Sequence, residues 1–187
     1  NALTGAINVV TRKERHSSLT ADLQTGSSFE SKEEGDGSGI YAGGAAEFTA
    51  NFGNREQRHL FALGQYMYNG QRYNSASANT RLFYNGQYDL DPDNNLQAMA
   101  GYARSRFGAN GFYAAPGDRN SEEIVRSAVF SLSSSHRIGD LILSPRISNR
   151  YGEDDYRYFK DDLSKGRSLH YTNALMLELN SSLDTEI

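Results

Sequence analysis

The sequence predicts an all-β protein, an antiparallel up-and-down meander of eight strands that forms part of a transmembrane β-barrel. Three observations lead to this prediction. Apolar and polar residues alternate along much of the 187-residue chain, while helical repeats are scarce. Several alternating segments are longer than 11 residues, whereas strands of soluble domains usually have about 5–6. The connections between the segments are alternately short and long.

The alternation of apolar and polar residues is seen in the first half of the chain, for example in the fourth predicted strand. In the fourth strand, Leu82 and Tyr84 share one face and oppose Arg81 and Asn85. Because successive side chains of a strand point to opposite sides of a sheet, this pattern gives one apolar and one polar face. The first four predicted strands cover residues 17–29, 40–53, 58–69 and 79–90.

The last four predicted strands show the same period of two. In the sixth strand, Phe130 and Leu132 face away from a series of serines. In the eighth, Leu175 and Leu177 oppose polar residues, and Asn173 is an exception on the apolar face. The last four predicted strands cover residues 95–107, 122–136, 139–155 and 168–182.

Every second connection is tight, and the others are long and polar. Outer-membrane barrels have this asymmetry, with short periplasmic turns and long extracellular loops. The short connections are residues 53–56, 91–94, 137–139 and 182–185, and the long ones are residues 30–39, 70–78, 108–121 and 156–167.

A membrane location explains why such a sheet must close. In hydrocarbon every backbone N–H and C=O has to be paired internally, so a spanning sheet has no free edge. The inner face tolerates charge, and we expect Arg81, Arg104, Arg146 and Arg150 to point inward. A soluble antiparallel sandwich also alternates polar and apolar residues, and it stays open as an alternative.

Composition argues against several other classes of protein. The net charge of −4 gives no reason to expect nucleic-acid binding, and the absence of cysteine excludes disulfides and thiolate metal sites. The mean hydropathy is −0.66, and no apolar run approaches the length of a membrane-spanning helix. The four histidines have no metal-ligand spacing. We expect no enzymatic activity, no cofactor and no metal site.

The N-terminal segment carries a family resemblance. Residues 5–13, Gly-Ala-Ile-Asn-Val-Val-Thr-Arg-Lys, resemble the end of the plug domain in TonB-dependent outer-membrane receptors. The segment "RFGANGFYAAPGDRNSEE" (106–123) resembles the third extracellular loop of such receptors for siderophores and cobalamin in Bacteroidetes. Residues 156–182 resemble their fourth loop and eighth strand, although Tyr171-Thr172-Asn173 departs from the commoner pattern there.

The resemblance implies a larger architecture than the chain contains. Members of the family have a barrel of 22 strands with an N-terminal plug inside it. Residues 1–13 then correspond to the C-terminal end of the plug, and residues 14–187 to the first eight strands of the barrel. We expect the chain to be a fragment of a longer receptor.

The resemblance also implies a function and partners. Receptors of this family reside in the outer membrane of Gram-negative bacteria, surrounded by its lipid. They capture an iron-siderophore or cobalamin and import it with energy supplied by TonB, which contacts a more N-terminal region. A small outer-membrane barrel with a structural or adhesive role and a soluble carbohydrate-binding β-sandwich are the alternative functions.

Ligand binding in such a receptor falls to the long loops. Aromatic side chains there offer a large contact area at low entropic cost, and cations such as Arg157 and Lys160 suit an anionic siderophore. Tyrosines near strand ends more often belong to a membrane-interface girdle, which we expect for Tyr84, Tyr88 and Tyr151 and also for Tyr66 and Tyr68. The candidate ligand-binding residues are Arg72, Tyr73, Phe112, Tyr113, Arg119, Tyr156, Tyr158 and Phe159.

Overall fold

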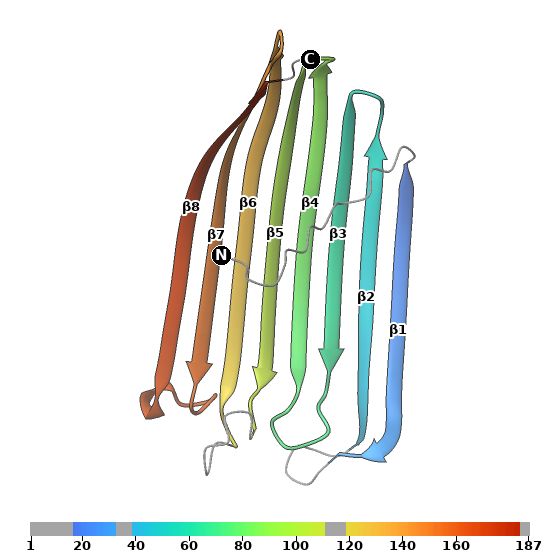
Figure 1. Cartoon of the computed structure of the whole chain (residues 1–187). Coiled ribbons are helices and arrows are strands. Elements are labelled where there is room, and N and C mark those ends of the chain that lie inside the picture. Colours follow the sequence, from blue (N-terminus) through green and yellow to red (C-terminus); the bar gives the residue numbers. More distant parts are fainter. Residues whose placement is uncertain (1–16, 33–38, 111–118, 184–187) are drawn as a thin grey trace, which may run out of the picture.

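The computed structural model describes residues 17–32, 39–110 and 119–183, and it contains eight long strands (Figure 1). All eight predicted strands are confirmed, with ends that differ by a few residues at most. The strands are β1 (Ser18–Ser31), β2 (Ile40–Gly53), β3 (Gln57–Tyr68), β4 (Ser77–Asp91), β5 (Asn94–Gly108), β6 (Glu122–Ile138), β7 (Leu141–Arg157) and β8 (Arg167–Leu183). A short 3-10 helix, η1 (Leu163–Lys165), precedes β8.

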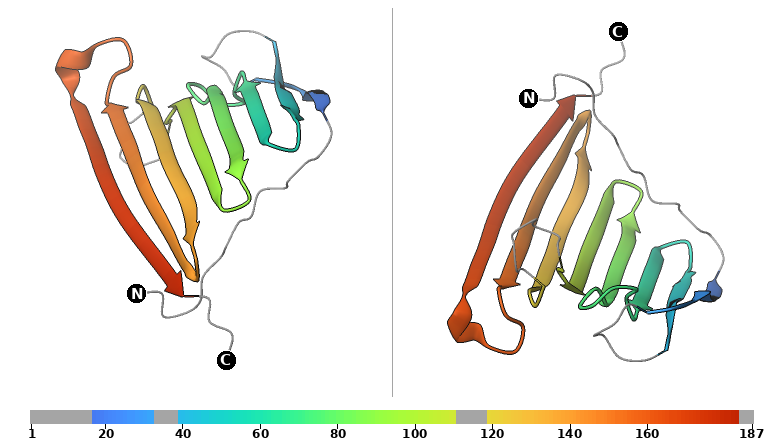
Figure 2. Two further views of the ribbon diagram at one scale, coloured as in Figure 1. Left: turned by 90° about the horizontal axis from the view of Figure 1, so that it is seen from above. Right: turned by 90° about the horizontal axis from the view of Figure 1, so that it is seen from below.

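The strands form one antiparallel sheet in the order β1 to β8, so the predicted meander is confirmed. Each strand pairs only with its neighbours in sequence, and β1 and β8 form the two edges. Figure 2 shows a single twisted layer in which these edges lie apart. The sheet is therefore open and does not close into a barrel.

All long connections leave the sheet at one end and all short connections at the other (Figure 1). The β6–β7 turn contains only Gly139 and Asp140 between the strands, and Gly139 adopts a φ of 62°. Glycine accepts this left-handed conformation without steric cost, which permits the tight reversal. We call the two ends of the sheet the short-turn end and the long-loop end.

Register divides the side chains between an apolar face and a polar face. One row across the apolar face joins Phe48, Leu63, Leu82 and Tyr102 as successive cross-strand partners. These large side chains stay exposed, at 36–47% of their surface. The adjacent row on the polar face joins Glu47, Gly64, Arg81, Ala103 and Ser127.

The apolar face changes character from one end of the sheet to the other. Its central band runs along β5 from Leu96 to Tyr102, which is about 20 Å at the rise of roughly 3.4 Å per residue in a strand. On β2 to β4 the band contains aromatic rings: the ring centroids of Phe52 and His59 lie 5.1 Å apart, and those of Phe61 and Tyr84 lie 4.7 Å apart. These rings occupy the rows that β5 continues with Ala98 and Ala100. Toward the long-loop end, charged side chains replace apolar ones.

Two asparagines on the apolar face form a hydrogen bond with each other through their side chains. Asn149 donates a hydrogen bond of 2.6 Å from its side chain to the Oδ1 atom of Asn173. The Asn149 amide also reaches the Ala174 carbonyl at 3.2 Å. A buried or lipid-facing amide is costly only when it is unpaired, so the exception that Asn173 makes to the alternation has a local explanation.

The expectation that Arg104 lies on the polar face is wrong. Arg104 pairs in register with Thr80 and Arg126, and both lie on the face that carries Tyr102. This position is beyond the apolar band, at the long-loop end, where charge is tolerated. Tyr66 and Tyr68 likewise lie on the polar face, opposite to Tyr84, so they do not belong to a girdle on the apolar face.

Pro145 lies inside β7 and interrupts its pairing with β6. The β6–β7 ladder omits the pairs between Ser133–Arg146 and His136–Leu143, although the register on both sides is the same. Proline has no N–H to donate, so a ladder that includes it loses hydrogen bonds. Pairing with β8 continues through Pro145 and Leu179.

No second layer covers the described sheet. Among the described residues, Ala109 and Ile124 are the buried hydrophobic side chains, and both lie at the long-loop end. No helix in the described part of the chain is long and apolar enough to cross a membrane. The segment 5–13, which carries the plug resemblance, lies outside the described residues.

Candidate ligand-binding site

The long-loop end is where the described residues are best packed. Although most of the sheet is exposed on both faces, a group of residues at this end is buried. Most of these are polar or charged, which requires hydrogen-bond partners within the protein. The buried hydrophobic and polar residues of the core are Asn74, Ala109, Ser121, Glu122, Glu123, Ile124 and Asp155.

Tyr73, in the connection from β3 to β4, stands at the centre of a cationic group. Its hydroxyl donates a 2.5 Å hydrogen bond to Asn120 Oδ1. The guanidinium carbon of Arg119 lies 5.4 Å from the centre of the Tyr73 ring, and Lys160 Nζ lies 5.7 Å from it. Cations at these distances are attracted to the ring face, so the three side chains form a compact cationic aromatic surface.

Hydrogen bonds join three long connections at this surface. The Asn110 side chain donates to the Tyr73 carbonyl at 2.6 Å, and the Lys160 N–H donates to the Asn120 carbonyl at 2.9 Å. Ala109 N–H donates to the Ser121 carbonyl at 2.9 Å, which ties the two ends of the β5–β6 connection together. We call this group the loop cluster; it comprises Tyr73, Asn74, Asn110, Arg119, Asn120, Ser121 and Lys160.

A chain of ion pairs runs beside the loop cluster across β5, β6, β7 and β8. Glu122 binds Arg106 at 2.5 Å and Arg157 at 3.3 Å. Asp155, which is 1% exposed, binds Arg157 at 2.8 Å and Arg167 at 2.6 Å. Each buried carboxylate therefore has two arginines, which offsets the cost of removing its charge from water.

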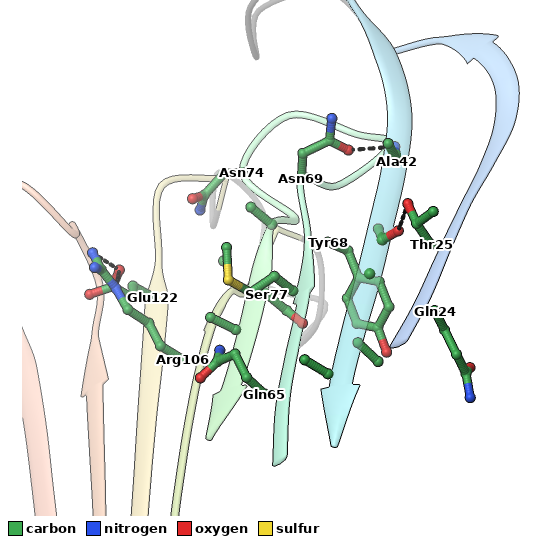
Figure 3. Close-up of a pocket in the computed structure, with 18 of the residues that line it drawn as sticks. Gln24, Thr25, Ala42, Gln65, Tyr68, Asn69, Asn74, Ser77, Arg106 and Glu122 are labelled. Carbon is green, nitrogen blue, oxygen red and sulfur yellow. Dashed lines mark hydrogen bonds and ion pairs between the residues drawn. The ribbon is translucent and has the colours of Figure 1, made fainter. Parts of the chain in front are cut away.

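A hollow of about 810 Å³ adjoins the loop cluster and is lined by residues of β1 to β6 (Figure 3). Small side chains such as Ala42 and Ala78, with Gly44, leave this space open. Figure 3 shows Arg106 and Glu122 paired at one side of it and Asn74 above it. The hollow has an apolar floor and polar groups at its edges, and the residues of its floor lie on the apolar face of the sheet.

The β7–β8 loop has a local structure of its own. Asp162 accepts hydrogen bonds from Ser164 Oγ at 2.6 Å and Ser164 N–H at 3.1 Å, and so caps η1. The bond from the Ser164 hydroxyl, followed by that from its N–H, lowers the pKa of Asp162. Tyr158 and Phe159 meet edge to face at 5.5 Å, and Lys165 Nζ lies 4.2 Å from the centre of the Phe159 ring.

The structure places the predicted site residues in different surroundings. Tyr73 and Arg119 meet in the loop cluster, and Tyr158 and Phe159 meet in the β7–β8 loop. Arg72 is exposed in the β3–β4 connection, next to Tyr73. Tyr156, predicted in a loop, lies within β7 because the β7–β8 ladder continues to the pair Arg157–Arg167. Phe112 and Tyr113 lie outside the described residues.

The sequence does not predict Asn74 of the loop cluster or the buried carboxylates beside it. Asn74, Glu122 and Asp155 were not candidates, although all three are buried and bonded. Asn74 lies in the segment Tyr-Asn-Ser, and asparagine is enriched where a turn needs a positive φ. This preference of asparagine for turns is the feature of the sequence that could have pointed to Asn74. Nothing in the sequence pattern separates Glu122 and Asp155 from solvated loop charges.

Comparison with protein-family models, curated proteins and solved structures found no match. The described residues contain no group of three or more His, Asp or Glu side chains arranged to hold a metal ion. The described site presents arginine, lysine, amide and aromatic groups.

Proposed function

We propose that the chain is part of a TonB-dependent receptor in the outer membrane of a Gram-negative bacterium. In this proposal residues 1–13 end the plug, and the eight strands begin a barrel of 22 strands. The receptor captures an iron-siderophore or cobalamin and imports it with energy from TonB. The observation that carries the proposal is the pattern on one face: a band of apolar and aromatic side chains, followed by charged side chains at the long-loop end.

The height of the apolar band and its charged border suit a bilayer. Outer-membrane barrels carry an outward apolar band about 25 Å tall with aromatic girdles at its borders, and the band along β5 is about 20 Å by the strand rise. The short turns leave from one end and the long connections from the other, beyond the charged border. This arrangement supports a membrane-spanning sheet with its long loops outside the cell.

The long-loop end supplies the chemistry for capture. Arg119 and Lys160 flank Tyr73, and this pairing of cations with a planar ring suits an anionic, partly aromatic iron chelate. Arg72, Tyr158 and Phe159 extend the surface from neighbouring connections. The receptor makes and breaks no covalent bond in its ligand.

The alternative functions fit the sheet less well. An eight-stranded barrel requires β1 to pair with β8, but these strands are opposite edges of the sheet. A β-sandwich requires a second packed sheet, and the described residues form a single layer. The first strands of a larger barrel, taken alone, would form an open sheet with two unpaired edges, as these strands do.

Uptake measurements test the proposal. Deletion of the gene that encodes this chain is expected to abolish uptake of either a labelled ferric siderophore or labelled cobalamin, and a plasmid copy is expected to restore it. Collapse of the inner-membrane proton gradient is expected to stop the same uptake. If deletion leaves uptake of both ligand classes unchanged, the transport proposal is wrong.

A further inference from the structure

Asn74, in the β3–β4 connection, contacts the two ends of the β5–β6 connection and the β7–β8 connection. We infer that Asn74 is a positioning residue that fixes the β3–β4 and β7–β8 connections and the described ends of the β5–β6 connection in a single arrangement. The effect of Asn74 on ligand capture rests on the proposed function: if the loops are fixed, Tyr73, Arg119 and Lys160 meet the ligand as a preformed surface. The role of Asn74 in the loops themselves is inferred from the contacts of its side chain and backbone.

The Asn74 side chain uses both its donor and its acceptor groups. Its amide nitrogen donates to the Ser121 carbonyl at 2.6 Å and to the Arg119 carbonyl at 3.0 Å. Its Oδ1 atom accepts a hydrogen bond from Lys160 Nζ at 3.3 Å. Since the side chain is 6% exposed, water has little access to replace these bonds.

The Asn74 backbone adds a fourth link and a steric constraint. Its carbonyl accepts from the Asn110 N–H at 3.4 Å, and its φ is 50°, a conformation that asparagine tolerates better than most residues. A Cβ atom added to Gly108 would lie 2.2 Å from the Asn74 carbonyl oxygen and 2.6 Å from Oδ1. Glycine at position 108 is therefore needed for the end of β5 to approach Asn74.

A preformed surface has a physical advantage for capture. Ordering loops at the moment of binding subtracts from affinity, whereas loops fixed during folding do not carry that cost. Asn74 supplies the fixation from a buried position, so it does not have to touch the ligand. This separates its role from that of Arg119 and Lys160, which would contact the ligand directly.

Spin labels on two of the connections test this role directly. The chain contains no cysteine, so Gln71→Cys and Asp161→Cys place labels at two exposed positions of the β3–β4 and β7–β8 connections. Pulsed electron resonance on the intact protein in its membrane then gives the distribution of distances between the labels. No ligand is present, so the result is independent of the transport proposal.

Two substitutions at position 74 separate its contacts. Asn74→Gly keeps the left-handed backbone but removes all the side-chain bonds, and we expect the distance distribution to widen about twofold. Asn74→Asp removes the donors to the β5–β6 connection but keeps the acceptor for Lys160. We therefore expect a narrow distribution for this label pair in Asn74→Asp.

Two glycine substitutions supply a second variant and a matched control. Gly108→Ala should widen the distribution as Asn74→Gly does, since its Cβ collides with Asn74. Gly26→Ala should leave it unchanged, because no atom lies within 4 Å of the added Cβ. Lys160→Met removes the hydrogen bond to Asn74 and the cation contact with Tyr73, and it gives the same widening if Asn74→Gly fails to assemble. Unchanged widths in Asn74→Gly, or in Lys160→Met in its place, overturn the inference.

Discussion

Two cations, the exposed Arg119 and the half-buried Lys160, give the loop cluster its charge. Both lie near the Tyr73 ring, and neither forms an ion pair with a carboxylate of the described residues. A ligand with negative charge can therefore approach both. Arg106 and Arg157, by contrast, are occupied by Glu122.

Replacing both cations should weaken binding of an anionic iron chelate. Each contact of a charged group contributes about 1.5–3 kcal/mol, so Arg119→Gln with Lys160→Gln is expected to weaken binding at least tenfold. Titration of the intact receptor with a ferric siderophore measures this. Arg55→Gln, at the short-turn end, is the matched control. An unchanged affinity at normal surface expression would count against a cationic capture surface.

The sequence predicts part of this cluster because loop aromatics and cations can be found by type and position. Tyr73 and Arg119 were found in that way. Asn74 was not, because its partners Ser121 and Lys160 are 47 and 86 residues away in sequence. Such contacts depend on how three connections pack together, and no local pattern records that packing.

At the scale of the elements, the period of two predicts the strands well and their faces nearly as well. Strand ends follow from apolar alternation and turn residues, so the eight strands were found. The prediction for Arg104 is wrong because Arg104 follows Tyr102 by two residues in β5 and therefore shares its face. The prediction of a loop at Tyr156 is wrong because Tyr156 pairs with Ser168 of β8, and the residues around Tyr156 do not indicate this pairing.

Adjacent residues of β6 offer a test of the two faces. Phe130 lies in the apolar band, and Ser131 points to the other face. An arginine on the lipid side of a barrel costs roughly 2–4 kcal/mol at the bilayer midplane, so Phe130→Arg should reduce barrel assembly, while Ser131→Arg should leave it nearly unchanged. Heat-dependent migration of the folded barrel on gels measures assembly. Equal loss in both variants would contradict the assignment of the faces.

The cap of η1 should make the β7–β8 loop sensitive to acid. Because the folded loop lowers the Asp162 pKa, its contribution is present above the ordinary carboxyl value near pH 4 and is lost as the pH falls through the lowered value. A spin label at Leu163→Cys should gain mobility in that acid range. Asp162→Asn should remove the change, and a pH-dependent label in that variant would refute the cap as its cause.

At the scale of the whole molecule, the open sheet has two features that call for a partner. The edges β1 and β8 carry unpaired backbone groups, and the apolar face exposes Leu175, Leu177 and others. Unprotected edges pair with other chains. We propose that the remaining strands and the lipid cover these surfaces in the intact receptor.

The isolated chain should therefore associate with itself. In solution without detergent, we expect edge-to-edge or face-to-face oligomers, because nothing else is available to cover the strands. Light scattering after size-exclusion chromatography measures the mass of the particles. A stable, monodisperse monomer would contradict this expectation and would favour a soluble protein.

The central claim is that one face of the sheet lies against hydrocarbon, and lipid accessibility along β6 tests it most directly. Single nitroxide labels at positions 127 to 132 of the protein in its native membrane can be probed with oxygen, which concentrates in lipid, and with a water-soluble nickel complex. We predict a period of two: labels at 128, 130 and 132 relax with oxygen and are shielded from nickel, while their neighbours show lower oxygen accessibility. Equal accessibility to nickel at Phe130 and Ser131 would contradict the account, because it would put both faces of the sheet outside the lipid.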